Sequence, residues 1–64
     1  MAVYDVKVKL TGTDGNAFAI MGKVSGALRK AGASKEDVEA YMQESMSGDY
    51  NHLLATACKW VNVS

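Results

Sequence analysis

The sequence predicts a small α+β domain in the order β-α-α-α-β, in which three helices cover one face of a two-stranded sheet. Three observations lead to this fold class. Residues 4–10 alternate between apolar and polar side chains, as a half-buried strand does. Residues 17–31 place apolar side chains at helical spacing. Residues 59–63 return to alternation and contain the β-branched and aromatic types that favour strands.

The length of the chain limits it to one domain, covering residues 1–64. A domain of this size buries only about 60% of its surface on folding, so its core is marginal. Small domains usually gain stability from a disulfide, a metal or a second copy. The single Cys58 cannot form an internal disulfide, and no Cys or His residues have zinc spacing. We therefore expect a homodimer with no metal and no cofactor.

Charge and hydropathy limit the partners. Seven basic and seven acidic residues give a net charge of zero, so no overall field concentrates the protein on nucleic acid or on an anionic membrane. The N-terminus lacks the basic and apolar regions of a signal peptide, and no apolar run reaches membrane-spanning length. The expected location is the cytoplasm, with no membrane partner.

The first half of the chain predicts a strand at about residues 3–10 and a helix at about residues 16–31. Between them, Asp14 and Asn16 are both plausible helix N-caps. Gly32 follows two basic residues and predicts the end of the helix. The side chains expected to face the core are Ala17, Ile20, Met21, Val24, Ala27, Leu28 and Ala31.

The second half predicts helices at about residues 35–47 and 50–58, followed by a strand at about residues 59–63. Ser34 and Asp49 are the expected N-caps of these helices, and Gly48 separates them. The residues expected to face the core are Val38, Tyr41, Met42, Ser45 and Met46, then Tyr50, Leu53, Leu54 and Ala57. The two strands have free edges, and pairing with a second copy would remove such an edge.

The first helix also carries a candidate partner-binding surface. Gly22 and Gly26 project away from its apolar stripe, together with Phe18, Ser25 and Arg29. Of these residues, Phe18, Gly22, Gly26 and Arg29 make up the candidate surface. Glycine inside a helix costs about 1 kcal/mol relative to alanine, so the two glycines call for a compensating contact. Either another element of the same fold or a second molecule can supply that contact. We take the second molecule as the functional hypothesis.

Weak binding of single-stranded nucleic acid is an alternative. The outward face of the predicted sheet would carry Lys7 and Lys9 on one strand. The other strand would add either Trp60 and Asn62 or Lys59, depending on its register. Basic and aromatic groups on a sheet can neutralise phosphates and stack on bases. These groups are few, and a solvated sheet face explains them equally simply.

Binding of a small anion at the loop before the first helix is a further alternative. Gly12, Asp14, Gly15 and Asn16 connect a predicted strand to a helix N-terminus, where free amides favour anions. The loop lacks the Gly-Lys-Ser/Thr of a phosphate-binding loop. A structural turn with a helix cap accounts for the same residues.

Catalysis is not expected. His52 is the only histidine, and it lies about 120° from Cys58 around the predicted third helix, which is poor geometry for a nucleophile and its base. No paired carboxylates stand at a spacing that suggests acid-base chemistry. The sequence therefore favours a protein that is not an enzyme.

Several segments together carry a resemblance. They are Leu10 to Gly12, Asp14 to Phe18, Ile20 to Gly22, Ala27 to Gly32 and Ser47 to Leu54. Over most of its length the chain resembles short uncharacterised proteins of bacteria, phages and mobile elements. That group has no assigned activity, so the resemblance implies an accessory context and assigns no role to a residue. The resulting hypothesis is a non-enzymatic, homodimeric interaction or accessory module.

Overall fold

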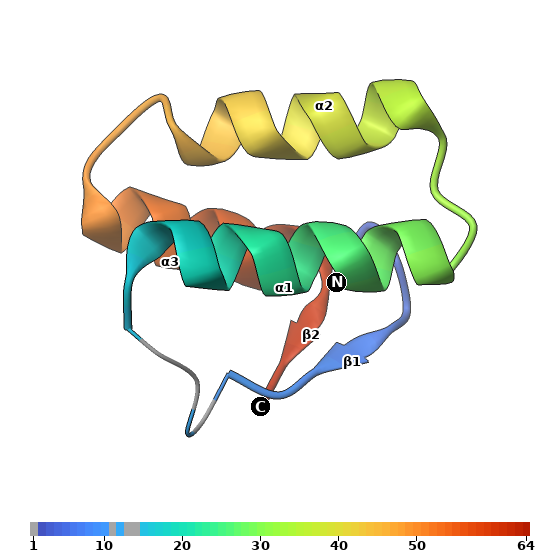
Figure 1. Cartoon of the computed structure of the whole chain (residues 1–64), viewed down its shortest axis with the longest axis horizontal. Coiled ribbons are helices and arrows are strands. Elements are labelled where there is room, and N and C mark those ends of the chain that lie inside the picture. Colours follow the sequence, from blue (N-terminus) through green and yellow to red (C-terminus); the bar gives the residue numbers. More distant parts are fainter. Residues whose placement is uncertain (1, 11, 13–14) are drawn as a thin grey trace.

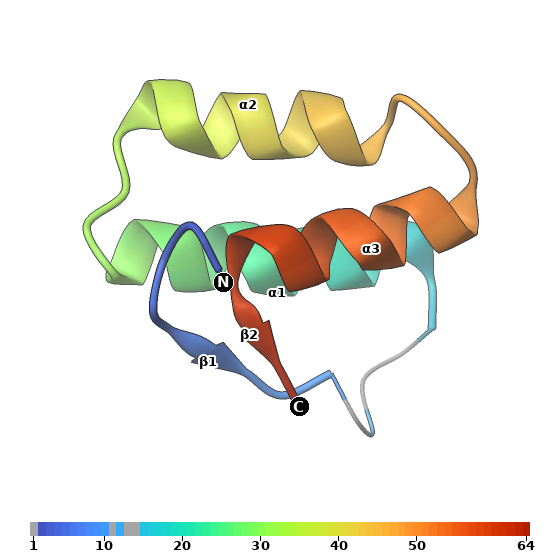
Figure 2. The same cartoon turned by 180° about the vertical axis from the view of Figure 1, so that it is seen from behind.

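The elements follow one another in the predicted order. The computed structural model describes residues 2–10, 12 and 15–64, and in this part the elements are β1 (Lys7–Val8), α1 (Ala17–Lys30), α2 (Lys35–Ser45), α3 (Tyr50–Trp60) and β2 (Asn62–Val63). The α+β class and the β-α-α-α-β order are confirmed. Figure 1 shows α2 on the side of α1 and α3 that is away from the strands, and Figure 2 shows the same arrangement from behind. The helices α1 and α3 contact the strands, and α2 packs on these two helices.

The two strands pair in parallel. Lys7 lies opposite Asn62, and Val8 lies opposite Val63. The N–H of Asn62 donates to the carbonyl of Val6 at 2.9 Å, which extends the pairing beyond the short strands. Parallel neighbours need a crossover connection, and here all three helices form it. The two-stranded sheet is therefore formed by the first and last elements of the chain.

The N-terminal strand is shorter than the predicted 3–10. Before β1, the N–H of Val3 donates to the carbonyl of Lys59 at 3.0 Å, and the N–H of Tyr4 donates to that of Trp60 at 2.9 Å. The backbone of this segment therefore forms hydrogen bonds with the C-terminal end of α3, and it does not pair with a strand. The predicted alternation nevertheless holds, because Val8 is buried while Lys7 is exposed.

The C-terminal strand is also shorter than the predicted 59–63, because α3 does not end at residue 58. It continues through Trp60, and Val61 is its C-cap. Lys59 and Trp60 are consequently helical, and their side chains do not alternate across a sheet. The prediction that these two residues belong to a strand is wrong.

Each helix begins at a side-chain cap. The Asn16 side chain accepts from the N–H of Phe18 at 2.8 Å, Ser34 accepts from Asp37, and Asp49 accepts from His52. Such caps satisfy backbone donors that have no partner inside the helix. Of the two caps considered for the first helix, Asn16 fills the position, and Asp14 lies outside the described residues.

The end of α1 is a glycine turn. Gly32 has φ +90°, a conformation that side chains disfavour and glycine adopts readily. Its N–H donates to the carbonyl of Arg29 at 3.0 Å, and the N–H of Ala33 donates to that of Leu28 at 2.9 Å. This pair of hydrogen bonds satisfies two carbonyls at the helix end. The predicted stop at Gly32 is confirmed.

The core lies where the three helices and β1 meet. The buried apolar side chains include Val8, Ile20, Met21, Val24, Leu28, Val38, Tyr41, Leu53, Ala57, Trp60 and Val61. The Tyr4 ring stacks on the edge of this core, and its hydroxyl donates to Oδ2 of Asp37 at 2.5 Å, which raises the pKa of the tyrosine. This contact ties the N-terminal segment to α2.

Four of the predicted orientations are wrong. Ala31, Met46 and Tyr50 were expected to face the core but are exposed, and Ser25 was expected on the outer side but is buried. The Ser25 hydroxyl donates to the carbonyl of Gly22 at 3.1 Å. This hydrogen bond within the helix satisfies the buried hydroxyl and lets it sit beside the apolar face.

Candidate interaction surface

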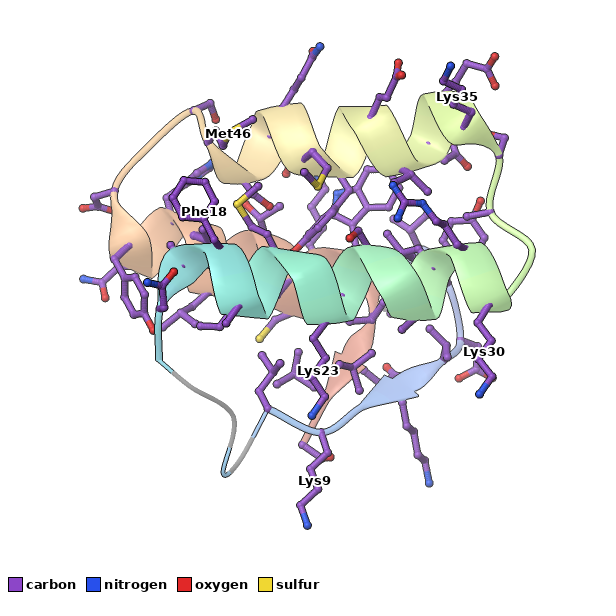
Figure 3. The ribbon with its side chains drawn as sticks, viewed as in Figure 1. Lys9, Phe18, Lys23, Lys30, Lys35 and Met46 are labelled. Carbon is purple, nitrogen blue, oxygen red and sulfur yellow. The ribbon has the colours of Figure 1, made fainter. Side chains whose placement is uncertain are left out.

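An exposed apolar cluster lies at one end of the molecule. The side chains of Phe18, Met46 and Tyr50 are 78%, 58% and 44% exposed. Figure 3 shows Phe18 and Met46 on the same side, between α1 and the end of α2. They border a pocket of about 240 Å³ lined by Ala17, Phe18, Met21, Ser45, Met46, Gly48, Asp49, Tyr50 and Leu53. Contiguous exposed apolar groups of this kind mark interaction sites.

The two glycines of α1 face open space. Apart from the adjacent backbone of α1 itself, a Cβ atom built on Gly22 or on Gly26 would meet no atom within 4 Å. Both positions are exposed, on the side of α1 that also carries Phe18. Close packing by another element of the same chain was the simpler explanation for these glycines, and the structure contradicts it.

The fourth predicted partner-binding residue, Arg29, lies near the opposite end of α1. It is exposed and borders a second pocket, of about 300 Å³, between the end of α1 and the start of α2. Arg29, Ala33, Lys35, Val38 and Glu39 line this pocket. The α1 surface therefore has an apolar cluster at its start and a pocket with charged walls at its end.

The residues predicted for nucleic-acid binding do not come together. Lys7 is exposed on β1, and Figure 3 shows Lys9 pointing away from the helices. Trp60 is only 8% exposed; it stacks on Tyr4 and meets the ring of Tyr41 edge-on. A tryptophan held in this way cannot stack on bases.

Lys59 points toward α2 instead of the sheet. Its Nζ lies 2.9 Å from Oε2 of Glu44, and Nε1–H of Trp60 donates to the other carboxylate oxygen at 3.4 Å. The hydrogen bond from Lys59 is the main reason that the pKa of Glu44 lies below its ordinary value. The sheet face therefore carries neither Lys59 nor Trp60 as a ligand for nucleic acid.

The described part of the predicted anion loop is engaged within the chain. Asn16 caps α1, and the hydroxyl of Tyr50 donates to the carbonyl of Gly15 at 2.6 Å. Gly12 has φ +82°, which suits a turn. Asp14 lies outside the described residues. A turn with a helix cap thus accounts for Gly12, Gly15 and Asn16.

His52 forms hydrogen bonds with the C-terminal end of α2. Nε2 of His52 lies 2.8 Å from the carbonyl oxygen of Glu44 and 3.1 Å from Oγ of Ser47. A carbonyl only accepts, so Nε2 carries the proton and donates it. With its proton on that nitrogen, His52 cannot accept the proton of Ser47 there. The serine–histidine contact is therefore a helix-end contact.

No residue set in the described part of the chain provides a metal site. Within that part, no group of three or more His, Cys, Asp or Glu residues could hold a metal ion, and Cys58 is exposed and free. None of the described helices has the length and apolarity needed to cross a membrane.

Sequence reasoning missed the exposure of two members of the apolar cluster and the lack of a hydrogen-bond partner at two buried hydroxyls. Met46 and Tyr50 lie at helix ends, where periodicity gives no reliable direction. Oη of Tyr41 and Oγ of Ser45 are buried without a hydrogen-bond partner, and burial raises the pKa of Tyr41. No pattern in the sequence indicates either feature.

Comparison with protein-family models, with curated proteins and with solved structures found no match. The resemblance to short proteins of phages and mobile elements therefore stays a prediction.

Proposed function

We propose that this chain is a non-enzymatic, cytoplasmic interaction module that works as a homodimer through the exposed face of α1. The observation that carries the proposal is Phe18, which is 78% exposed beside Met46 and Tyr50. An aromatic side chain left in water loses the free energy that its burial would contribute, and a partner can supply that burial. The open positions at Gly22 and Gly26 allow a second backbone to approach closely.

The size of the chain supports association with a second copy. A standard interface covers about 800 Å² on each partner. That is about one fifth of the 4072 Å² surface of this chain. For a domain with a marginal core, burying such an area is a substantial gain in stability.

The test is sedimentation equilibrium at tens of micromolar on the unmodified chain and on Phe18→Ser. We expect the unmodified chain to have the mass of a dimer. An aromatic side chain that is fully buried in an interface pocket contributes about 2 kcal/mol or more, so the variant should dissociate with a Kd raised about 30-fold.

The matched control is Val3→Ser. Val3 is another large apolar residue, 55% exposed, on the N-terminal segment. This variant should associate like the unmodified chain. A monomeric unmodified chain, or an equal loss of association in both variants, would contradict the proposal.

A further inference from the structure

Four residues of the α1 face form one stripe along the helix. At about 100° per residue, Phe18, Gly22 and Arg29 fall within an arc of about 40°, and Gly26 lies next to it. All four are exposed. The stripe therefore has a large apolar group at one end, two open positions in the middle and a cation at the other end.

This stripe is complementary to itself when reversed. In an antiparallel pair, the register is set by the point of α1 that the two-fold axis crosses. If Phe18 of one copy lies opposite Arg29 of the other, that point falls between residues 23 and 24. If Gly22 lies opposite Gly26, it falls at residue 24. The two points differ by half a residue, which is less than about 1 Å along a helix. One register therefore satisfies both pairs. A parallel pair would instead bring Arg29 against Arg29, which is unfavourable.

We propose that α1 packs antiparallel against α1 of a second copy about a two-fold axis, so that Phe18 of each copy enters the pocket beside Arg29 of the other. The arrangement rests on the proposed function and specifies its geometry. A two-fold axis makes both contacts at once, because every copy carries both the ring and the pocket.

The pocket suits a phenyl ring. Its volume is about 300 Å³; Ala33 and Val38 provide apolar walls between the charged residues Arg29, Lys35 and Glu39. A cavity of about 150 Å³ is enough to bind benzene. Arg29 also lines this pocket, so its guanidinium can rest on the face of an inserted ring. The pocket thus offers both apolar burial and a cation–π contact.

Charge favours the same arrangement. Arg29 of the second copy would approach the apolar cluster near Asp49, which lines the pocket beside Phe18. Within a single chain, no described carboxylate forms an ion pair with Arg29. The opposite-charge contact expected across the two-fold axis is therefore Arg29 of one copy with Asp49 of the other.

The experiment uses an equimolar mixture of isotope-labelled and unlabelled chain, in which filtered NOE spectra detect contacts between copies. We expect contacts from the ring protons of Phe18 to the methyl groups of Ala33 and Val38. Contacts between Phe18 and Phe18, or contacts between copies confined to the strands, would overturn the arrangement. A dimer without the expected contacts refutes only the arrangement. A monomer refutes the proposed function with it.

A charge reversal gives a second readout. Arg29→Glu should raise the Kd of the dimer at least 10-fold, because it removes the cation from the rim of the pocket. Lys30→Glu is the matched control, since this exposed neighbour projects about 100° away from Arg29. If Lys30→Glu raised the dimer Kd as much as Arg29→Glu does, the effect would come from net charge alone. That result would count against the arrangement.

Discussion

Replacing Trp60 by alanine is expected to lower the free energy of unfolding by about 3–5 kcal/mol. The indole is 8% exposed and is held between the rings of Tyr4 and Tyr41. Its removal leaves a cavity where α3 meets the N-terminal segment. Stabilities of about 0.05–0.15 kcal/mol per residue leave a chain of 64 residues little reserve. Trp60→Ala should therefore be largely unfolded at 37 °C, as measured by circular dichroism.

Trp60→Phe is the control for this prediction. It keeps an aromatic ring in the cavity and should cost less than the alanine variant in urea titrations. If Trp60 lay on a solvated sheet face, even Trp60→Ala would change stability by no more than about 0.5 kcal/mol. A result in that range would contradict the buried position.

Gly48→Ala is the second large effect. A Cβ at residue 48 would lie 2.7 Å from Cγ of His52 and 2.8 Å from its Cβ. The ring has little freedom to move, because its Nε2 donates to the carbonyl of Glu44. Overpacking of this kind costs about 1–3 kcal/mol. Urea titration at a concentration where the chain is monomeric should show that loss.

Gly22→Ala is the matched variant, with the same chemical change at an open helix position. Removing a glycine from the interior of a helix stabilises it by about 1 kcal/mol. The two alanine variants should therefore move the free energy of unfolding in opposite directions. Stabilisation by Gly48→Ala would show that the contact with His52 does not constrain residue 48.

Local signals predicted the helices well. Asn16, Ser34 and Asp49 cap their helices through their own side chains, and Gly32 ends α1 through its own backbone conformation. Such features depend on a few neighbouring residues. The parallel pairing of β1 with β2 depends on residues more than 50 positions apart. The sequence near either strand contains no information about that register.

The position of Trp60 shows how two patterns can compete. Residues 59–63 alternate like a strand, but Leu53, Ala57 and Trp60 also have the i, i+4, i+7 spacing of a helix face. The helical spacing prevails, since all three side chains are buried. A correct prediction from spacing therefore required residues 53–60 to be considered together, because residues 59–63 by themselves look like a strand.

The candidate surface was partly predictable for a similar reason. Periodicity along the 14 residues of α1 indicated that Gly22 and also Phe18, in the first turn, face outward. Met46 is the C-cap of α2, and Tyr50 is the first residue of α3. The turn between these helices sets the directions of both side chains, and helix periodicity does not extend through a turn.

The central claim is that the open face of α1 is where a second copy packs. The most direct test is the dimer Kd of Gly22→Leu, measured by sedimentation equilibrium beside the unmodified chain. A leucine at this position meets no atom of its own chain close to its Cβ, so the monomer should fold normally. Between two closely packed helices it should cost about 1–3 kcal/mol, which raises the Kd about 5-fold to 150-fold. A Gly22→Leu dimer as tight as that of the unmodified chain would contradict the claim.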